Sequence, residues 1–358
     1  MCTLRFLSRA AEGVFNLKNK NPLASFILIR FISMVIILFI LGFAVFGLMS
    51  LAPGDIVDQY AQKQLFAMTE GADQGDETMT EQQLAEIKRQ LGLDLPFYRQ
   101  YLRWLHQVFV EHDLGTSMIS RAPILFLIRS RLINSIILNL ISLVFLTGIS
   151  FALGIYFSSK VGTRTDLAAT FIALFLHAFP GLLLLILLQL FAALTNLFPV
   201  TAYPDFPYAE APTRFVFSYL HHIILPLIGA FLGGIGGTMR MIRATMLDQL
   251  GQPYITALRS RGVSERRVYL NHAFRNTLNP YITSSANLLA SLFSGSLILE
   301  IIFSYPGIGR LMYEAVRQED INLVLANIMF ISFLVLTGML VADILLALVD
   351  PRIRYSAE

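Results

Sequence analysis

The sequence predicts an all-α polytopic membrane protein with six transmembrane helices and a loop subdomain outside the membrane between the first two. Hydrophobic residues make up 55% of the 358 residues and charged residues only 14%, against about 25% in an ordinary soluble domain. The apolar residues also fall into runs of about 20 or more, long enough to cross a hydrocarbon core of ~30 Å. We therefore expect the chain to cross a bilayer several times.

The first apolar run covers 26–51 and is predicted to be the first transmembrane helix. Its one charge, Arg30, lies near its start. A cleavable signal peptide has an apolar core of about 7–15 residues, roughly half the length of this run. Pro53-Gly54-Asp55 then follows without an A-x-A cleavage site. We expect the run to remain in the mature protein, with 1–25 as a cytoplasmic N-terminal extension.

Residues 52–132 form the longest polar region and are predicted to be an extracytoplasmic loop subdomain. A capping-box pattern at Thr80 and Gln83 opens a helix that is expected to stop near Gly92. A second, amphipathic helix is expected over 97–110, with aromatic residues along its apolar face. The region could cap the pore mouth or lie on the membrane surface as a connector, and the sequence favours neither.

Five more apolar runs are predicted to complete a transmembrane core at 133–349. They cover 133–157, 167–195, 220–238, 281–303 and 323–349. The run at 220–238 is the least helix-prone because it contains Pro226 and several glycines, although small residues permit close packing of membrane helices. The run at 281–303 has a small, polar face that includes Asn287 and Ser291. That face could pack against a partner helix or line a wet path.

The distribution of Lys and Arg predicts the orientation. Six spans put both termini on one side of the membrane, and that side collects 16 basic residues. The other side carries three once the long loop is left out, because long loops contribute little to the positive-inside rule. Both termini, including the tail at 350–358, and the polar segment at 249–276 are therefore expected to be cytoplasmic.

Several kinds of chemistry are absent from the sequence. A P-loop needs Gly-Lys before Ser or Thr, and none of the five lysines follows a glycine. No H-E-x-x-H, paired cysteine motif or G-x-S-x-G occurs, and His221-His222 suits the membrane interface better than a metal. A net charge of +3 is too small to indicate nucleic acid. We expect no catalysis, no metal and no cofactor on this chain.

Ionisable residues inside membrane spans are candidates for function, and three occur here. His177 lies in the third predicted span, where it could line a cavity or form a hydrogen bond within the bundle. Glu300 lies near the outer end of the fifth span and Asp343 near the cytoplasmic end of the sixth. We expect Asp343 to form an ion pair with Arg240 or Arg243, and a proton relay is the alternative.

The polar segment at 249–276 is basic and helix-prone, and it lies between two apolar runs. It is predicted to form two short helices, over 252–261 and 265–272, with Gly262 as the elbow and Ser264 as the cap of the second. The pair could dock on a soluble protein, and the alternative is a basic patch on anionic headgroups. The residues expected on its faces are Tyr254, Ala257, Leu258, Arg261, Glu265, Arg266 and Arg267.

The same segment carries a recognisable order of residues. It contains Thr256-Ala257-Leu258, then Gly262, then His272-Ala273-Phe274-Arg275-Asn276. This order resembles the cytoplasmic loop of binding-protein-dependent ABC importer permeases, E-A-A-x-x-x-G followed by I-x-L-P. The dipeptide, oligopeptide and nickel branch has a form close to R-G-(L/V)-S-E-R-x-V…H-A-(L/F)-R-N, to which 261–276 is similar.

Further motifs extend this resemblance from 26 to 355. They are Leu51-Ala52-Pro53-Gly54-Asp55, Leu91-Gly92-Leu93-Asp94, Tyr101-Leu102-Arg103-Trp104, Asp113-Leu114-Gly115, Phe303-Ser304-Tyr305-Pro306-Gly307-Ile308-Gly309 and Asp350-Pro351-Arg352-Ile353-Arg354-Tyr355. They look like the end of the family's first span, its periplasmic loop and its closing motifs. The extension at 1–20 and the acidic stretch at 73–80 have no counterpart there.

The resemblance implies a fold, partners and a cargo. The fold would be that of an ABC type I importer permease in a bacterial inner membrane, as the B-type subunit beside a second, homologous permease. Two ATPase subunits holding ATP and Mg²⁺ would dock on the loop, where His272, Arg275 and Asn276 join the contact residues. A solute-binding protein would deliver peptides, although nickel complexes, glycosides and peptide-like antibiotics stay open. The alternative is a stand-alone channel or an ion-coupled carrier.

Overall fold

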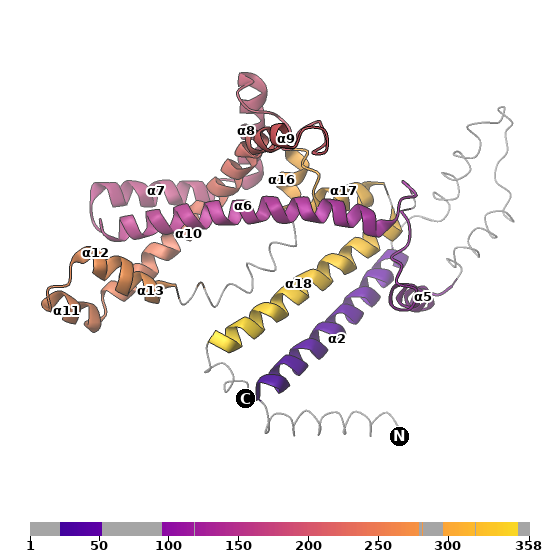
Figure 1. Cartoon of the computed structure of the whole chain (residues 1–358), viewed down its shortest axis with the longest axis horizontal. Helices are drawn as coiled ribbons and strands as arrows, with labels where there is room; N and C mark the ends of the chain where they lie inside the picture. The colour runs from indigo at the N-terminus through magenta and orange to yellow at the C-terminus, as the bar shows by residue number, and fades with distance from the viewer. Residues whose placement is uncertain are drawn as a thin grey trace. The chain divides into compact units, whose positions relative to one another are not determined.

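A computed structural model describes residues 22–51, 95–117, 119–278, 281, 296–318 and 320–349 (Figure 1). These residues form helices and connecting loops, with one isolated β-bridge between Thr116 and Pro123. The chain divides into two compact units. The first comprises Met1–Ser130 and Met312–Leu340, and the second comprises Arg131–Leu311 and Val341–Glu358.

Four helical stretches in the described part are long and apolar enough to cross a membrane. They are Ile27–Leu48, Ile124–Ser158, Pro212–Leu250 and Asn322–Ile344. They lie in α2 (Pro22–Leu51), α6 (Ile124–Ser158), the pair α9 (Pro212–His222) and α10 (Ile224–Leu250), and α18 (Ile321–Val349). They confirm the first, second, fourth and sixth predicted spans. Most of the fifth, at 281–303, lies outside the described residues.

The stretch at 167–195 was expected to be one span and is instead two helices. α7 (Arg164–Ala178) and α8 (Gly181–Thr195) are bent by 95°. Phe179 between them has an extended backbone, with φ −73° and ψ 131°. The next residue, Pro180, disfavours the α conformation at Phe179 and has no N–H to donate within a helix. The prediction of a continuous third helix is wrong, and the pair is a fifth span only if both halves count as one.

In the first unit, α2 and α18 lie side by side and run antiparallel (Figure 1). The Thr337 hydroxyl donates a 4.0 Å hydrogen bond to the Met34 sulfur. Later in α2, a Cβ built on Gly42 would lie 3.1 Å from the terminal methyl of Met329. Because a later residue of α2 meets an earlier residue of α18, the two helices point in opposite directions.

Helix α5 (Phe97–Phe109) confirms the predicted amphipathic helix at 97–110 and packs on α2. Its buried Tyr101 donates a 2.9 Å hydrogen bond to the carbonyl oxygen of Phe39. A Cβ on Gly42 would lie 2.8 Å from the Tyr101 ring, so this approach requires a glycine. The helix predicted to begin at Thr80, the acidic stretch and the rest of the long loop up to 94 lie outside the described residues.

The loop after α5 is joined to the start of α18 by a buried carboxylate. Asp320 precedes α18 and accepts a 2.5 Å hydrogen bond from the Ser117 hydroxyl. Its other oxygen accepts the N–H of Leu323 at 3.1 Å, as an N-cap side chain does. Ser117, 203 positions earlier in the chain, therefore binds the same carboxylate that caps α18.

In the second unit, α6 and α7 pack closely on α10 through glycines. A Cβ on Gly236 would overlap the carbonyl oxygen of Ala173 in α7, and one on Gly234 would lie 2.6 Å from Leu146 in α6. The glycines that made 220–238 the least helix-prone run therefore serve helix packing, as small residues do in membrane proteins.

Candidate functional site

The polar segment forms a helical knob at the C-terminal end of α10, and we call residues 251–278 the knob (Figure 1). It consists of α11 (Pro253–Ser260), a turn, and a helical stretch made of α12 (Glu265–Arg267), the π-helical turn η1 (Val268–Ala273) and α13 (Phe274–Thr277). Two short helices on either side of a turn confirm the predicted arrangement.

Gly262 forms the elbow, as predicted. Its φ is +77°, a left-handed conformation that costs a non-glycine residue about 1–2 kcal/mol. The Gly262 N–H bonds the Arg259 carbonyl at 3.0 Å, and the Val263 N–H bonds the Leu258 carbonyl at 3.1 Å. This pair of bonds is a Schellman motif, which usually includes an apolar contact such as the packing of Leu258 and Val263 against one cluster.

The knob has an apolar side that is buried against the C-terminal half of α10. Ile255 of α11 and Val268 of η1 are fully buried with Ile242 and Met246 of α10. Leu258 is half-buried against the same cluster. Leu258 replaces the second Ala of the E-A-A pattern and was expected on the contact surface. The structure places it inside the knob, where a larger apolar side chain fills the interior.

An ion pair that the sequence analysis missed closes the elbow. The Arg259 Nε and NH2 groups donate to the two Glu265 oxygens at 2.8 and 3.1 Å. This hydrogen bond lowers the pKa of the Glu265 carboxyl and raises the pKa of the Arg259 guanidinium. The sequence did contain a signal for this ion pair, because the oppositely charged Arg259 and Glu265 flank the turn at Gly262.

The second helix of the knob differs from the prediction in two ways. Ser264 has the extended backbone of an N-cap, but its side chain makes no capping bond. Its carbonyl instead accepts the N–H groups of Arg267 and Val268 at 2.9 and 3.1 Å. The helix also widens into η1 and continues to Thr277, beyond the expected end at 272. Single π-helical turns often occur at functional sites, but residue spacing alone does not reveal them.

A chain of side chains joins two helices of the knob to the end of α10. The Asn276 amide donates to the Tyr254 hydroxyl at 3.1 Å, and that hydroxyl donates to Gln249 at 3.2 Å. The contacts connect α13, α11 and the end of α10. Tyr254 and Asn276, both predicted site residues, therefore help to hold the knob's shape.

The outer face of the knob is positively charged. Arg261, Arg266, Arg267 and Arg275 are exposed, as is Ala257, whereas His272 is half-buried. Within the described ranges, none of these four arginines forms an ion pair. Such groups are free to meet an acidic partner.

Glu300, predicted as an intramembrane polar candidate, lies in a closed network. It belongs to α16 (Leu297–Ile302) and is fully buried. Its carboxylate accepts the Ser135 hydroxyl at 2.7 Å and the Arg310 N–H at 3.0 Å. Ser135 in turn accepts the Ile308 N–H at 2.8 Å. Because Ile308 and Arg310 open α17 (Ile308–Arg317), the carboxylate lies at a helix N-terminus, which favours negative charge.

The motif around Glu300 is shaped to fit the carboxylate. A Cβ on Gly307 would overlap it, and a Cβ on Gly309 would lie 3.0 Å from it. Tyr305 donates its hydroxyl to the Asn134 carbonyl at 2.8 Å. The glycines of Tyr305-Pro306-Gly307-Ile308-Gly309 thus make room for an internal carboxylate.

Two of the other intramembrane candidates, His177 and Asp343, lie on helices other than the α16 of Glu300. His177 lies in the last turn of α7 and is exposed, and a Cβ on Gly237 of α10 would lie 3.7 Å from its ring. Arg243, an expected partner of Asp343, instead bonds Asp166 twice at 2.7 Å, a residue that the sequence analysis missed. Asp343 is half-buried in α18. The remaining candidates, Asn287 and Ser291, lie outside the described residues.

Apolar spans that end in a basic helical knob define a polytopic helical membrane protein. The chain belongs to the family described as binding-protein-dependent transport system inner membrane component, which it matches over 146–355. It also matches the N-terminal domain of such membrane components over 23–152. The two matches together cover almost the whole described chain and place the knob inside the first.

Named relatives agree with the family. The oligopeptide transport system permease protein AppB of Bacillus subtilis (strain 168) is 35% identical over 267 residues, 74% of this chain and 83% of the relative. A putative peptide transport system permease of Brucella abortus (strain 2308) is 32% identical over 334 residues, 93% of this chain and 100% of the relative. The glutathione transport system permease GsiC of Escherichia coli O6:H1 (strain CFT073) is 29% identical over 333 residues, 92% and 99% of the two chains.

Proposed function

We propose that this chain is a permease subunit of an ATP-driven importer of peptides, and that its knob docks an ATPase subunit. One observation carries the docking role: the chain continues beyond a membrane span into a folded knob that is packed by apolar residues against α10 and has an exposed basic outer face. A simple connection between two spans would need neither. The absence of Gly-Lys supports a division of labour in which ATP and Mg²⁺ bind to partner subunits.

The peptide cargo is supported by the relatives, whose names specify oligopeptide, peptide and glutathione transport. The family description supports a separate solute-binding protein. We propose that this protein delivers its cargo on the side opposite the knob, and that the chain pairs with a second permease and two ATPase subunits. His177, Asn287, Ser291 and Asp343 remain candidate pathway residues.

The proposed orientation has both termini and the knob in the cytoplasm. The antiparallel run of α2 and α18 supports it, because the start of the first span and the end of the last then face one side. ATP binding would close the ATPase pair, move the knobs and switch access between the two sides, as a distant ligand biases a two-state element.

A transport assay separates this function from its alternative. The chain is reconstituted in proteoliposomes with its partner subunits and solute-binding protein, and uptake of labelled dipeptides and oligopeptides is measured. A substitution of the P-loop lysine in both ATPases is expected to abolish uptake. Uptake that continues in that variant would reject the ATP-driven importer and favour a stand-alone channel or ion-coupled carrier.

A variant of the knob tests docking directly. The triple variant Gly262→Pro, Arg266→Glu and Arg267→Glu should insert into the membrane but uncouple ATP hydrolysis from uptake, because both elbow and charge are changed. The control is Lys160→Glu with Arg164→Glu, which reverses two exposed charges on the same predicted side, in the turn before α7 and at its first residue. Equal loss of uptake in both variants would indicate a general effect of surface charge, and normal uptake in the triple variant would refute docking.

A further inference from the structure

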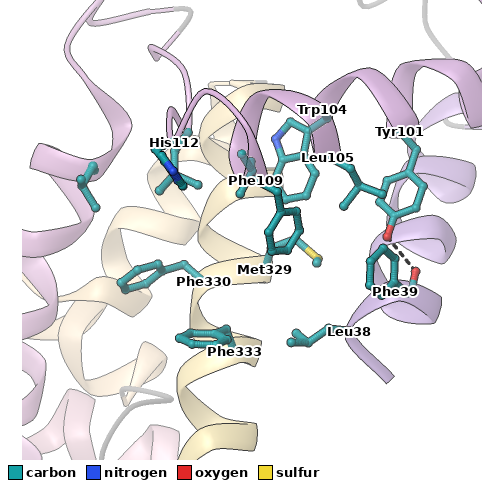
Figure 2. Close-up of a pocket in the computed structure, with 13 residues that line it drawn as sticks. Leu38, Phe39, Tyr101, Trp104, Leu105, Phe109, His112, Met329, Phe330 and Phe333 are labelled. Atoms are coloured by element: carbon teal, nitrogen blue, oxygen red, sulfur yellow. Dashed lines mark hydrogen bonds between the residues drawn. The ribbon is translucent and has the colours of Figure 1, made fainter. Parts of the chain in front are cut away.

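The first unit contains an apolar cavity of about 340 Å³. Figure 2 shows α5 lying over the space between α2 and α18, with Trp104 directed into that space and Phe330 and Phe333 on the α18 side. Leu38 and Phe39 contribute the α2 side. The volume lies at the lower end of the range of small-molecule sites, about 300–1,000 Å³.

The packing of α5 on α2 maintains this cavity. The Tyr101 ring packs directly against Gly42, and its hydroxyl donates a hydrogen bond to the Phe39 carbonyl. The Phe46 ring packs 5.3 Å from the Tyr101 ring and 5.9 Å from the Trp104 ring, measured between centroids. These contacts hold α5 against α2 beside the cavity, which Tyr101 and Trp104 also line.

The cavity is open at the depth of the hydrocarbon. Leu38 and Phe39 lie in the middle of the apolar span Ile27–Leu48. Several lining residues are exposed, with Phe39 at 43%, Leu125 at 52% and Phe333 at 45%. Apolar side chains exposed on a membrane span face lipid, so acyl chains have access to the cavity.

The face of α5 opposite the residues that line the cavity is basic. α5 contains Arg99 and Arg103 and no acidic residue. Both arginines are exposed, and neither forms an ion pair in the described part of the chain. Because an amphipathic helix with a basic polar face lies in the plane of the headgroups, these side chains can reach a phosphate while Trp104 faces the acyl region.

We propose that this cavity binds one acyl chain of a bilayer phospholipid, whose phosphate group meets Arg99 and Arg103. The site combines an apolar slot beneath α5 with positive charge on the polar face of the same helix, which matches the two ends of one lipid molecule. The bound lipid would fill the void between the first and last spans and fix the position of α5.

Trp104, the chain's only tryptophan, supplies the probe. The complete transporter is stripped of lipid in detergent and titrated with phosphatidylglycerol brominated in the middle of one acyl chain. Fluorescence quenching is measured for the wild-type transporter and for the Trp104→Phe transporter. Their difference is the quenching of Trp104, because tryptophans of the partner subunits contribute equally to both. We expect this quenching to saturate near one lipid per chain. Quenching that rises without saturation would indicate bulk lipid contact and overturn the site.

Filling variants test the cavity itself. Val108→Phe and Leu38→Phe fill it from α5 and α2, and each should reduce saturable quenching by more than half. The matched control is Leu102→Phe on α5, a 61% exposed position outside the cavity, which should quench normally. Unchanged quenching in both filling variants would refute the proposal. Absent quenching in the wild-type transporter would show that protein covers the cavity, which also refutes it.

A last comparison tests the headgroup contact. Arg99→Gln with Arg103→Gln should weaken binding of the anionic lipid by about fivefold per arginine. Brominated phosphatidylcholine should bind the wild type more weakly than phosphatidylglycerol does. If the wild type and the double variant bind phosphatidylglycerol with equal affinity, the two arginines do not contact the headgroup and that part of the proposal is wrong. Native mass spectrometry of the same samples checks the lipid count.

Discussion

At the scale of single residues, the Glu300 carboxylate explains a glycine-rich motif far better than local conformation does. Gly307 and Gly309 do not have the positive φ that usually requires glycine. Their Cα atoms instead lie against the carboxylate, which bridges Ser135 and the first turn of α17. The glycines are required by a close approach between residues, and the carboxylate satisfies donors that would otherwise be buried without partners.

Gly307→Ala is therefore expected to destabilise the protein by about 1–3 kcal/mol, the usual cost of overpacking a filled site. The measurement is thermal unfolding of the detergent-solubilised transporter. Gly148→Ala is the control, because a Cβ there has nothing within 4 Å and a helical Gly→Ala change should be neutral or stabilising. Equal melting temperatures for Gly307→Ala and the wild type would contradict the close approach.

At the scale of the element, the knob is a small folded unit whose parts are held by different forces. The Schellman turn at Gly262 sets the direction of the chain, and the cluster around Ile255 fixes α11 on α10. Arg259 and Glu265 then join the two helices across the turn. The ion pair, and the packing of Val268 against Ile255, connect the parts of the knob before and after the elbow.

The Arg259–Glu265 pair predicts how the elbow responds to pH and substitution. The pKa of Glu265 is lowered in the folded chain. The stability that its ion pair gives the elbow is therefore fully present above the ordinary Glu pKa of about 4.3, and it is lost as the pH falls through the lowered pKa. Glu265→Gln removes the negative charge at every pH, so at neutral pH it should loosen the elbow as acid loosens the wild type. Amide exchange at Gly262 and Val263 should then be faster. Hydrogen exchange with mass spectrometry measures this.

The charge swap Arg259→Glu with Glu265→Arg is the matched control. It restores the pair in reverse and should return exchange toward the wild-type rate, whereas each single change should not. If the swap exchanges as fast as Glu265→Gln, the ion pair does not hold the elbow.

At the scale of the whole molecule, the chain forms two units that do not follow its order. The first unit joins the N-terminal part to Met312–Leu340, and the second contains most of α6 and the chain from there through α16. In the first unit the first and last spans are neighbours, with Met34 next to Thr337. Chain connectivity alone does not require this pairing.

A cysteine crosslink tests the pairing. In a Cys2→Ser background, which removes the chain's only cysteine, Met34→Cys with Thr337→Cys should form a disulfide in membranes on mild oxidation. Ile40→Cys with Thr337→Cys is the control, because Ile40 is 64% exposed and lies nearly two turns further along α2. The readout is altered gel mobility that reverses on reduction. Crosslinking of the control pair alone would contradict the antiparallel packing.

The sequence alone determined the class of protein, most of the spans and the knob's helix–turn–helix form. These follow from local properties: the length of apolar runs, and the conformational freedom of Gly262 at a helix end. Pro180 was a local signal for the break between α7 and α8. The break was not predicted because the apolar run at 167–195 is long enough for a single span.

Only the tertiary structure decided where the polar groups find partners. Glu300 meets Ser135 from 165 positions earlier, and Arg243 meets Asp166 rather than the expected Asp343. It also turned Leu258 inward and left a cavity beside Trp104. Residue spacing cannot predict such contacts, because they depend on which faces of distant helices come together.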